Sequence, residues 1–397
     1  MDDPLETQEM TEDEEPEIQI NELTLSDKEK SILYGSSEPT TIFTPRVPTE
    51  ELSNLQIKED TDYKINPRLT ISDNTAEVFC LRFSPDGKFL AAGCGDGAIR
   101  VFSAQTGKLS YNLQAGSNIA LPTTCIRFRP ITQSSRTKNV LIASNAAGVV
   151  QHWHMTSGKC LHSLEDENNQ VYAMDYNTEG SMFVTVGKDT VIRVYDEATK
   201  SASVTMSSGL GYSSKNTTGH SNRIFSAKFH PTHENIIVTG GWDNTVQIWD
   251  IREGQAIRSF FGPHICGDSL DVCNNEILTG SWRIEKQLEI WDFLSGQKIK
   301  DVAWSSDAAK SSPNQPSCML YAAQFSKEGA GRFIGAGGSG TNEAKLFDHH
   351  KNDACVGIIT GLSKGIFALD FSPDNQRFAV AGGDTSIRIL DICKKGI

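Results

Sequence analysis

The sequence predicts an all-β fold of seven repeated units, the pattern of a seven-bladed β-propeller, and three observations support this prediction. An aromatic or apolar residue that ends a strand before a turn recurs at spacings of 43 to 53 residues, a period typical of propeller blades. The segments between turns alternate apolar and polar residues, as in Ala98–Phe102, which is the period of a β-strand. The turns themselves contain the residues that turns require, as in Ser84–Gly87.

Two landmarks define each unit. The first ends the innermost strand, and it falls at Phe83, Phe128, Tyr176, Phe229, Val272, Phe325 and Phe371. The second is an apolar or aromatic pair that ends a later strand, and it falls at Val101–Phe102, His152–Trp153, Val194–Tyr195, Ile248–Trp249, Ile290–Trp291, Leu346–Phe347 and Ile389–Leu390. The regular return of both landmarks indicates that each unit repeats the same set of strands.

One unit has a complete motif. It begins with Gly219-His220, has a turn with the sequence Gly-Gly-Trp-Asp-Asn at 240–244, and ends with Trp249-Asp250. These motifs resemble the WD-repeat family, and the resemblance covers residues 64–393. It implies four-stranded antiparallel blades and a buried, hydrogen-bonded structural tetrad of His220, Thr239, Asp243 and Trp249. The turn Asp is missing from the second, fifth and sixth units, which we therefore expect to be the least regular blades.

The last unit ends early. Only six residues follow Asp391, too few for a turn and a fourth strand, and an open sheet edge is a pairing hazard. Propellers of this family usually close by lending an N-terminal strand to the last blade. Residues Tyr63–Ser72, with Ile65, Leu69 and Ile71, are the predicted closing strand, and residues 63–397 are the predicted propeller domain.

The acidic charge is confined to the N-terminal segment. Residues 1–62 contain 18 acidic and 4 basic residues, whereas residues 63–397 contain 32 acidic and 33 basic residues. A polar, acidic segment cannot bury enough apolar surface to order itself, so residues 1–62 are predicted to be a disordered tail. The balanced propeller lacks the basic face that nucleic-acid binding requires, so we expect no nucleic-acid partner.

No run of the sequence is long and apolar enough to cross a membrane, and the acidic N-terminus is unlike a secretory signal. We therefore expect no membrane association and an intracellular protein. A cytoplasmic location is the first expectation, with nuclear and ciliary locations left open.

Aromatic residues recur at one position of the innermost strands. They are Phe79, Tyr172, Phe225, Tyr321 and Phe367, with Thr124 at the position in the second unit. The family resemblance places this position at the mouth of the central channel, where many WD-repeat proteins hold partner peptides, and it places Trp242, Trp282 and Arg283 further out on the same rim. Aromatic residues and Arg are the usual anchors of binding energy, although packing between blades is an alternative role for them.

The motifs of catalysis and metal binding are weak. Gly335–Gly340 fits a dinucleotide-binding pattern, but a strand follows it instead of the helix that would receive the phosphates. His152 and His154 share a strand face, yet no further ligand is placed beside them. The tetrad is buried in the related proteins. The sequence thus predicts no enzyme activity, no cofactor and no metal site.

The favoured function is a non-catalytic interaction scaffold, which binds a partner protein or peptide through its aromatic rim and channel mouth within a multiprotein complex. One alternative is a structural component of a large cytoskeletal or ciliary, microtubule-associated assembly that uses several faces of the propeller. Another is a reader of modified peptides, which would need a charge-selective pocket. The fold alone does not decide between them.

Overall fold

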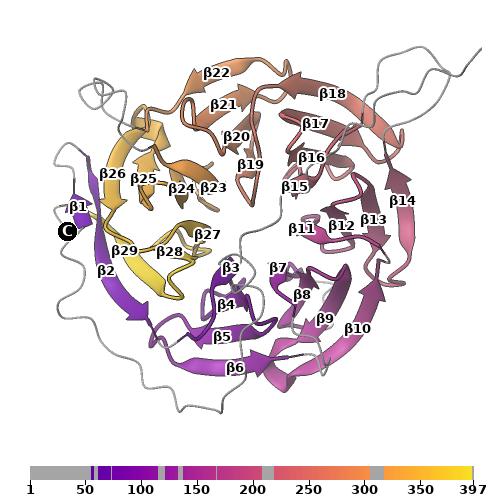
Figure 1. Cartoon of the computed structure of the whole chain (residues 1–397), viewed down its shortest axis with the longest axis horizontal. Helices are drawn as coiled ribbons and strands as arrows, with labels where there is room; N and C mark the ends of the chain where they lie inside the picture. Colours follow the sequence, from indigo (N-terminus) through magenta and orange to yellow (C-terminus); the bar gives the residue numbers. More distant parts are fainter. Residues whose placement is uncertain are drawn as a thin grey trace, which may run out of the picture. The chain divides into compact units, whose positions relative to one another are not determined.

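The computed structural model describes residues 55–57, 61–72, 74–114, 121–132, 137–166, 168–207, 219–304 and 317–395. The strands of the propeller form seven antiparallel sheets around a central channel, as Figure 1 shows. In each sheet, one strand lies beside the channel and the fourth strand lies at the outside. The predicted seven-bladed, all-β propeller is confirmed.

The blades are numbered in chain order. Blade one contains β3 (Val78–Phe83), β4 (Phe89–Cys94), β5 (Ile99–Ser103) and β6 (Leu109–Leu113), and blade two contains β7 (Thr123–Phe128), β8 (Val140–Asn145), β9 (Val149–His154) and β10 (Lys159–Glu165). Blade three contains β11 (Val171–Tyr176), β12 (Met182–Gly187), β13 (Ile192–Asp196) and β14 (Ala202–Met206). Blade four contains β15 (Ile224–Phe229), β16 (Ile236–Gly241), β17 (Thr245–Asp250) and β18 (Gln255–Phe261).

Blade five contains β19 (Leu270–Cys273), β20 (Glu276–Gly280), β21 (Leu288–Asp292) and β22 (Lys298–Asp301). Blade six contains β23 (Met319–Phe325), β24 (Phe333–Ser339), β25 (Ala344–Asp348) and β26 (Ala354–Ile359), and blade seven contains β27 (Ile366–Phe371), β28 (Arg377–Gly382) and β29 (Ile387–Lys394). Two short 3-10 helices, η1 (Met155–Ser157) and η3 (His349–Lys351), follow β9 and β25. None of the helices in the described ranges has the length and apolar character needed to cross a membrane.

The position of a strand within its blade explains its residue pattern. All six residues of β16 in blade four are buried, because the neighbouring blades cover both faces of the sheet near the channel. In the outer strand β18 of the same blade, by contrast, exposed residues alternate with buried ones. The blades diverge toward the outside, so an outer strand keeps one face in solvent.

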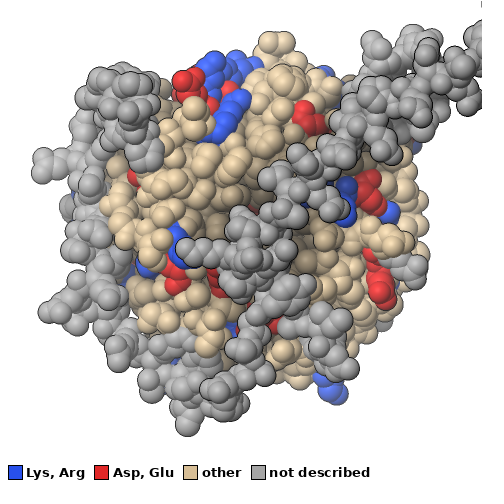
Figure 2. Space-filling view, viewed as in Figure 1, with Lys and Arg blue, Asp and Glu red and all other residues tan. Residues whose placement is uncertain are grey.

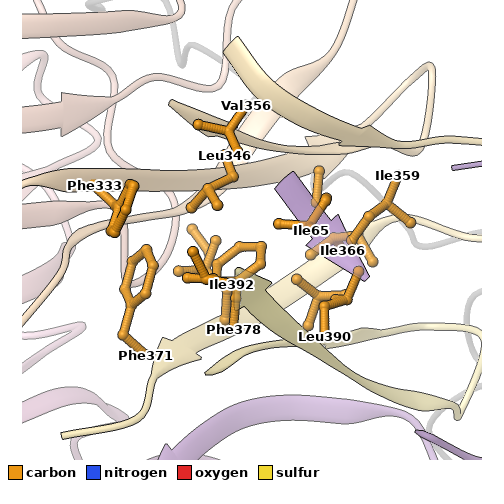
Figure 3. Packing of buried hydrophobic residues seen from close by; sticks show 14 residues of the cluster. Ile65, Phe333, Leu346, Val356, Ile359, Ile366, Phe371, Phe378, Leu390 and Ile392 are labelled. Atoms are coloured by element: carbon orange, nitrogen blue, oxygen red, sulfur yellow. The ribbon is translucent and has the colours of Figure 1, made fainter. Parts of the chain in front are cut away.

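The closing strand β2 (Tyr63–Ile71) completes blade seven. It pairs antiparallel with β29, from Tyr63 opposite Lys394 to Ile71 opposite Ile387. Its Ile65 is fully buried between blades six and seven, where Figure 3 shows it among side chains that include Leu346, Ile366 and Leu390. The predicted closure by an N-terminal strand is therefore confirmed.

A further strand, β1 (Leu55–Ile57), lies within the segment that was predicted to be disordered. It pairs antiparallel with β26 and gives blade six five strands. The sequence prediction missed this strand because three residues carry no periodic signal, whereas the unpaired backbone edge of β26 can accept any extended segment. Residues 1–54 and 58–60 of the predicted tail lie outside the described residues.

The expectation that blades two, five and six are the least regular is only partly correct. Blades two and six have innermost strands of 6 and 7 residues, as long as those of the other blades. Blade five departs, since its innermost strand β19 has 4 residues and begins at Leu270. The turn Asp is thus not what makes a blade regular, because three strand pairings and two covered faces already fix the sheet.

Candidate functional site at the channel mouth

The innermost strands of six blades share an irregularity near the start of the strand. The pairing register shifts between Val78 and Cys80 in blade one, and at the equivalent place in blades two, three, four, six and seven. Such a bulge leaves one residue unpaired and redirects its side chain. The residues at these bulges are Phe79, Thr124, Tyr172, Phe225, Tyr321 and Phe367.

These six residues line one central cavity of about 400 Å³, and Asp268 of blade five lines it with them. Each is the fourth residue before its landmark, since Asp268 precedes Val272 by the same interval at which Phe79 precedes Phe83. We call these seven positions the upper ring. The five aromatic residues predicted from sequence are thus brought together, and Asp268 completes the ring at a position that sequence reasoning left out.

The aromatic side chains contact one another in two groups that together form an arc. Tyr172 and Phe225 stack at a centroid distance of 4.5 Å, and Phe79 and Phe367 stack at 5.7 Å. Tyr321 meets Phe367 edge to face at 5.4 Å. The arc is interrupted at blade two, where Thr124 occupies the ring position, and at blade five, where Asp268 does.

The two predicted Trp residues join the ends of this arc on the rim. Trp242 lies 5.3 Å from Phe225, and Trp282 lies 6.4 Å from Tyr321. Between the two indoles lies His264, at 6.0 Å and 6.4 Å from them. Each Trp side chain remains 38% exposed. Sequence reasoning did not include His264 in this site, because it belongs to the connection between β18 and β19 and lies outside the repeated landmarks.

Polar contacts fix the orientation of the rim aromatics. The indole N–H of Trp242 donates to Cys266 Sγ at 2.9 Å, and the guanidinium of Arg223 lies over the ring at 5.4 Å. Burial raises the pKa of the Cys266 thiol to about 12, so this thiol is neutral and a poor nucleophile. Burial also lowers the pKa of His264, which keeps its imidazole neutral at physiological pH.

Arg283 makes internal contacts. Its guanidinium donates to the carbonyl oxygens of Gly262 at 2.8 Å and Lys286 at 2.9 Å, and it pairs with Glu289 Oε2 at 2.5 Å. These bonds tie the turn between β20 and β21 to the end of blade four. Arg283 therefore has a structural role in the rim, and its part in partner binding stays a prediction.

A lower ring of six charged residues and one amide lies beneath the aromatics. It consists of the residues that directly precede the landmarks, namely Arg82, Arg127, Asp175, Lys228, Asp271, Gln324 and Asp370. Opposite charges pair across blades, with Arg127 Nε 3.3 Å from Asp175 Oδ1 and Lys228 Nζ 4.0 Å from Asp271 Oδ1. These pairs tie neighbouring inner strands together.

The carboxylates of the lower ring also bind backbone. Asp370, Asp175 and Asp271 accept the N–H groups of the landmark residues in the next blade, Phe83 at 2.7 Å, Phe229 at 2.9 Å and Phe325 at 2.9 Å. The carboxylate therefore joins two blades by a bond that any residue at the landmark can make. The sequence does not predict this hydrogen bond between blades, because its donor is a backbone N–H that every residue at the landmark has.

Asp268 connects the two rings. Its carboxylate pairs with Arg82, with Arg127 Nη2 at 3.1 Å and with Lys228 Nζ at 3.3 Å. Burial lowers the pKa of Lys228 to about 8, and the nearby Arg127 contributes to this shift. The cavity thus has an aromatic wall and a floor of paired charges.

The tetrad residues lie away from the cavity and form a closed network in blade four. The indole N–H of Trp249 donates to Thr239 Oγ1 at 2.8 Å, Thr239 Oγ1 lies 2.7 Å from His220 Nε2, and His220 Nδ1 lies 2.8 Å from Asp243 Oδ2. His220 and Thr239 are buried. Every donor has an acceptor, so this Asp, His and hydroxyl set serves as a satisfied core network rather than as a reactive triad.

The other motifs have structural partners as well. Gly335 lies in β24, where a Cβ would approach the Phe378 ring to 2.5 Å, so this glycine permits close packing between blades six and seven. His152 Nε2 lies 3.1 Å from Glu197 Oε2 in the buried region between blades two and three. Within the described part of the chain, no group of three or more His, Cys, Asp or Glu residues is arranged to hold a metal ion.

Family models match four segments of the chain. The model described as "Anaphase-promoting complex subunit 4 WD40 domain" matches residues 63–130. The model described as "WD domain, G-beta repeat" matches residues 158–196, 211–250 and 353–391. The matches cover the closing strand, all of blade one and most of blades three, four and seven, together with β7 and β10 of blade two and β26 of blade six.

Relatives with different names share this similarity. A ribosome biogenesis protein WDR12 homolog from Drosophila mojavensis is 21% identical over 78% of this chain and 71% of the relative. A U3 small nucleolar RNA-associated protein 21 homolog from Schizosaccharomyces pombe is 23% identical over 57% of this chain and 23% of the relative. The cilia- and flagella-associated protein 52 from Bos taurus is 23% identical over 58% of this chain and 34% of the relative.

The chain spans between 18% and 44% of the length of five curated relatives that it matches. Such matches reflect the repeated blade, and they cover less than half of each of these relatives. The repeat models, the seven antiparallel sheets of four or five strands and the strand that closes blade seven lead to one conclusion. The chain belongs to the WD-repeat β-propeller family.

Proposed function

We propose that the chain is a non-catalytic scaffold that binds a segment of a partner protein at the mouth of the central channel, within a multiprotein complex. One observation carries this proposal: equivalent positions of all seven blades converge on a single cavity, and five of them are aromatic. Cavities of this kind, with mostly apolar walls and few polar groups, suit ligand side chains. The exposed Trp242 and Trp282 would extend the contact onto the rim.

A protein partner fits the site better than a nucleic acid does. Aromatic arcs can stack bases, but such sites combine them with a positively charged groove. Here the cations beneath the arc are paired with carboxylates. Figure 2 shows Lys, Arg, Asp and Glu side chains scattered over the described part of the visible face, without a continuous basic area.

The absence of an enzymatic role and the location in the cell are part of the same proposal. The best-formed Asp, His and hydroxyl set is the buried tetrad, and the Cys266 thiol at the cavity is neutral.

We place the protein inside the cell. The relatives named for ribosome biogenesis and for cilia make nuclear and ciliary locations as compatible with the fold as a cytoplasmic one.

A second candidate function is that of an assembly component that uses several faces of the propeller. The observation that favours it is a set of exposed apolar side chains away from the cavity in blades four and five. They are Ile257, Phe261, Ile284, Leu294 and Ile299, with exposed fractions from 45% to 73%. Such side chains mark contact surfaces when they gather into patches.

Two variants separate these functions. The mouth variant carries Trp242→Ala, Trp282→Ala and Tyr321→Ala, and the wall variant carries Ile257→Ser, Phe261→Ser and Leu294→Ser. Both are purified from cells with bound proteins, after thermal melting shows that they fold like the wild type. The channel-mouth proposal expects the mouth variant alone to lose a discrete partner.

Loss of partners from the wall variant alone would favour the assembly component. Partners that survive both sets of substitutions would reject binding at either surface. Recovery of nucleic acid in place of protein, removed by nuclease and by the mouth substitutions, would contradict the choice of partner class.

A further inference from the structure

The seven positions of the upper ring are chemically unequal. Blade five presents a carboxylate, Asp268, where five other blades present an aromatic ring. The chain reaches this position by passing close to blade six, since a Cβ on Gly267 would lie 2.4 Å from the carbonyl oxygen of Tyr321. The N–H of Ser269 donates to the carbonyl of Gly267 at 2.8 Å, which tightens the turn. The tight turn at Gly267 and its close approach to blade six therefore hold Asp268 in the channel.

Asp268 is shared by cations from three other blades. Arg82 comes from blade one, Arg127 from blade two and Lys228 from blade four, and all three contact this carboxylate. The same cations face the carboxylates of the lower ring, at 4.0 Å from Asp370, 3.3 Å from Asp175 and 4.0 Å from Asp271.

The network is electrically balanced only when Asp268 is counted. Its cations are Arg82, Arg127, Lys228 and Lys327, and its carboxylates are Asp175, Asp268, Asp271 and Asp370. Lys327 enters through its pair with Asp370 at 2.8 Å. Arg82 and Asp268 are the charged residues of this network that line the cavity. Without the Asp268 charge, the floor would present one uncompensated positive charge to a bound side chain.

A neutral floor beneath aromatic walls discriminates between ligand side chains. An apolar side chain gains contact with the aromatic arc and has little hydration to lose. A carboxylate would lose its hydration, and the cations that could compensate it are already paired. We propose that Asp268 sets the specificity of the channel mouth, so that the cavity accepts an uncharged, apolar side chain of the partner and rejects an acidic one. This proposal rests on the proposed function.

Selection of random peptides tests this proposal directly, because the cavity itself then chooses the anchor side chain. A phage-displayed library of random peptides is selected against the full chain, the Asp268→Asn variant and the Asp189→Asn variant. Asp189 is the matched control, because its side chain has 22% exposure against 23% for Asp268 and it forms a salt bridge with Arg193 in a turn that does not line the cavity. Circular dichroism and thermal melting establish that each variant is folded.

The wild type and the Asp189→Asn variant should select peptides with an apolar anchor residue. The Asp268→Asn variant should select peptides with Asp or Glu at the anchor position. A change of the anchor from Leu to Glu in one selected peptide should weaken binding to the wild type and strengthen binding to Asp268→Asn, each on the order of tenfold. Identical peptide pools from the wild type and from folded Asp268→Asn would overturn the proposal.

A second variant keeps the test decisive if Asp268→Asn does not fold. Thr124→Lys adds a positive charge at the blade-two position of the upper ring and leaves the Asp268 pairs in place. It should also enrich acidic anchors, and unchanged selection with this folded variant would count against the proposed charge control.

Failure of the proposed function has a separate signature. Peptides selected on the wild type must lose binding to the mouth variant with Trp242→Ala, Trp282→Ala and Tyr321→Ala. If they bind that variant equally well, the channel mouth is not the binding site, and both proposals fall. If binding requires these aromatics and ignores Asp268, only the specificity proposal is wrong.

Discussion

Blades four and five are neighbours that use different chemistry to hold the same four-stranded sheet. In blade four, Trp249, Thr239, His220 and Asp243 form one unbroken chain of hydrogen bonds. Blade five keeps only the first step, from Trp291 Nε1 to Thr279 Oγ1 at 3.0 Å. Where blade four has Asp243, blade five has Arg283, which pairs with the buried Glu289.

The comparison teaches that the tetrad is one of several ways to secure a blade. The propeller fold needs strand pairing and two covered faces, which both blades have. The buried network of blade four adds stability that depends on complete hydrogen bonding, whereas blade five relies on an ion pair near the rim. The two arrangements should therefore respond differently to mutation and to pH.

The largest effect should come from a change that touches neither blade. Deletion of residues 1–72 removes β2, opens the ring beside β29 and uncovers the site of Ile65, so we expect loss of cooperative unfolding in thermal melting. The matched control, deletion of residues 1–57, removes β1 but keeps β2. If both truncated proteins melt like the full chain, β2 does not close the ring.

The next largest effect should separate the two blades. Thr239→Val removes the hydroxyl that is hydrogen-bonded to both Trp249 and His220. Thr279→Val removes the hydroxyl that accepts the hydrogen bond from Trp291. Each buried polar group left unpaired costs about 1 to 3 kcal/mol, so the loss of unfolding free energy in denaturant should be roughly twice as large for Thr239→Val. Equal losses would mean that the His and Asp steps add nothing to blade four.

The two blades should have opposite dependence on pH. Burial alone would raise the pKa of Asp243. The hydrogen bond from His220 and further polar contacts outweigh burial, so the pKa of Asp243 is lowered. Asp243 thus stabilises the fold above the unfolded-state pKa and loses that contribution as pH falls through its lower folded-state value. Burial raises the pKa of Glu289, so its favourable contribution is complete at low pH and is lost as pH rises.

Denaturant unfolding at several pH values between 7 and 4 measures this contrast. The stability difference between the wild type and Asp243→Asn should shrink as pH falls. The difference between the wild type and Glu289→Gln should shift in favour of the wild type over the same range. Parallel slopes for the two variants would show that the two carboxylates have similar environments.

Arg283→Met should have a smaller effect on stability. The substitution removes the ion pair with Glu289 and the bonds to the Gly262 and Lys286 carbonyls, but Arg283 is partly exposed, so we expect a loss of about 1 kcal/mol in denaturant unfolding. Partner or peptide binding is measured in parallel, because Arg283 is also predicted to contact a partner. Loss of binding by the folded variant would support that prediction, and unchanged binding would leave Arg283 with a structural role alone.

The smallest effects on stability should come from Trp242→Ala in blade four and Trp282→Ala in blade five. Both side chains are 38% exposed, so each substitution should change the free energy of unfolding by about 1 kcal/mol or less. In binding measurements, truncation of an anchor at the centre of an interface costs about 2 kcal/mol or more. A variant with lowered stability and unchanged binding would identify that Trp as a packing residue.

The extent to which sequence predicts this molecule follows from where its signals lie. The landmarks Phe83 to Phe371 gave the blade number, and the early end of blade seven pointed to Tyr63–Ile71 as the closing strand, because both depend on side-chain periodicity. The same periodicity placed Phe79 and its equivalents at one position. It did not anticipate that the strands bulge there, since a bulge is a property of paired backbones.

Other parts of the site could not be predicted from side-chain periodicity alone. Asp268 occupies a ring position, but the role of its carboxylate follows from its ion pairs with Arg82 and Lys228. These pairs form only in the folded protein. His264 lies in the connection between β18 and β19, outside the repeated landmarks. The short strand Leu55–Ile57 depends on the free edge of β26, which is created only when blade six has folded.

The pairing of β2 with β29 has a consequence for the synthesis of this protein. Arg68 and Asp391, which pair across these strands, are separated by 323 residues, and the ribosome adds only about 5 to 20 residues per second. The strand that seals the ring is therefore among the first parts of the propeller to emerge, while its acceptor is among the last. For tens of seconds β2 of the nascent chain therefore remains unpaired, and during this time it must not pair with the edges of earlier blades or with another polypeptide.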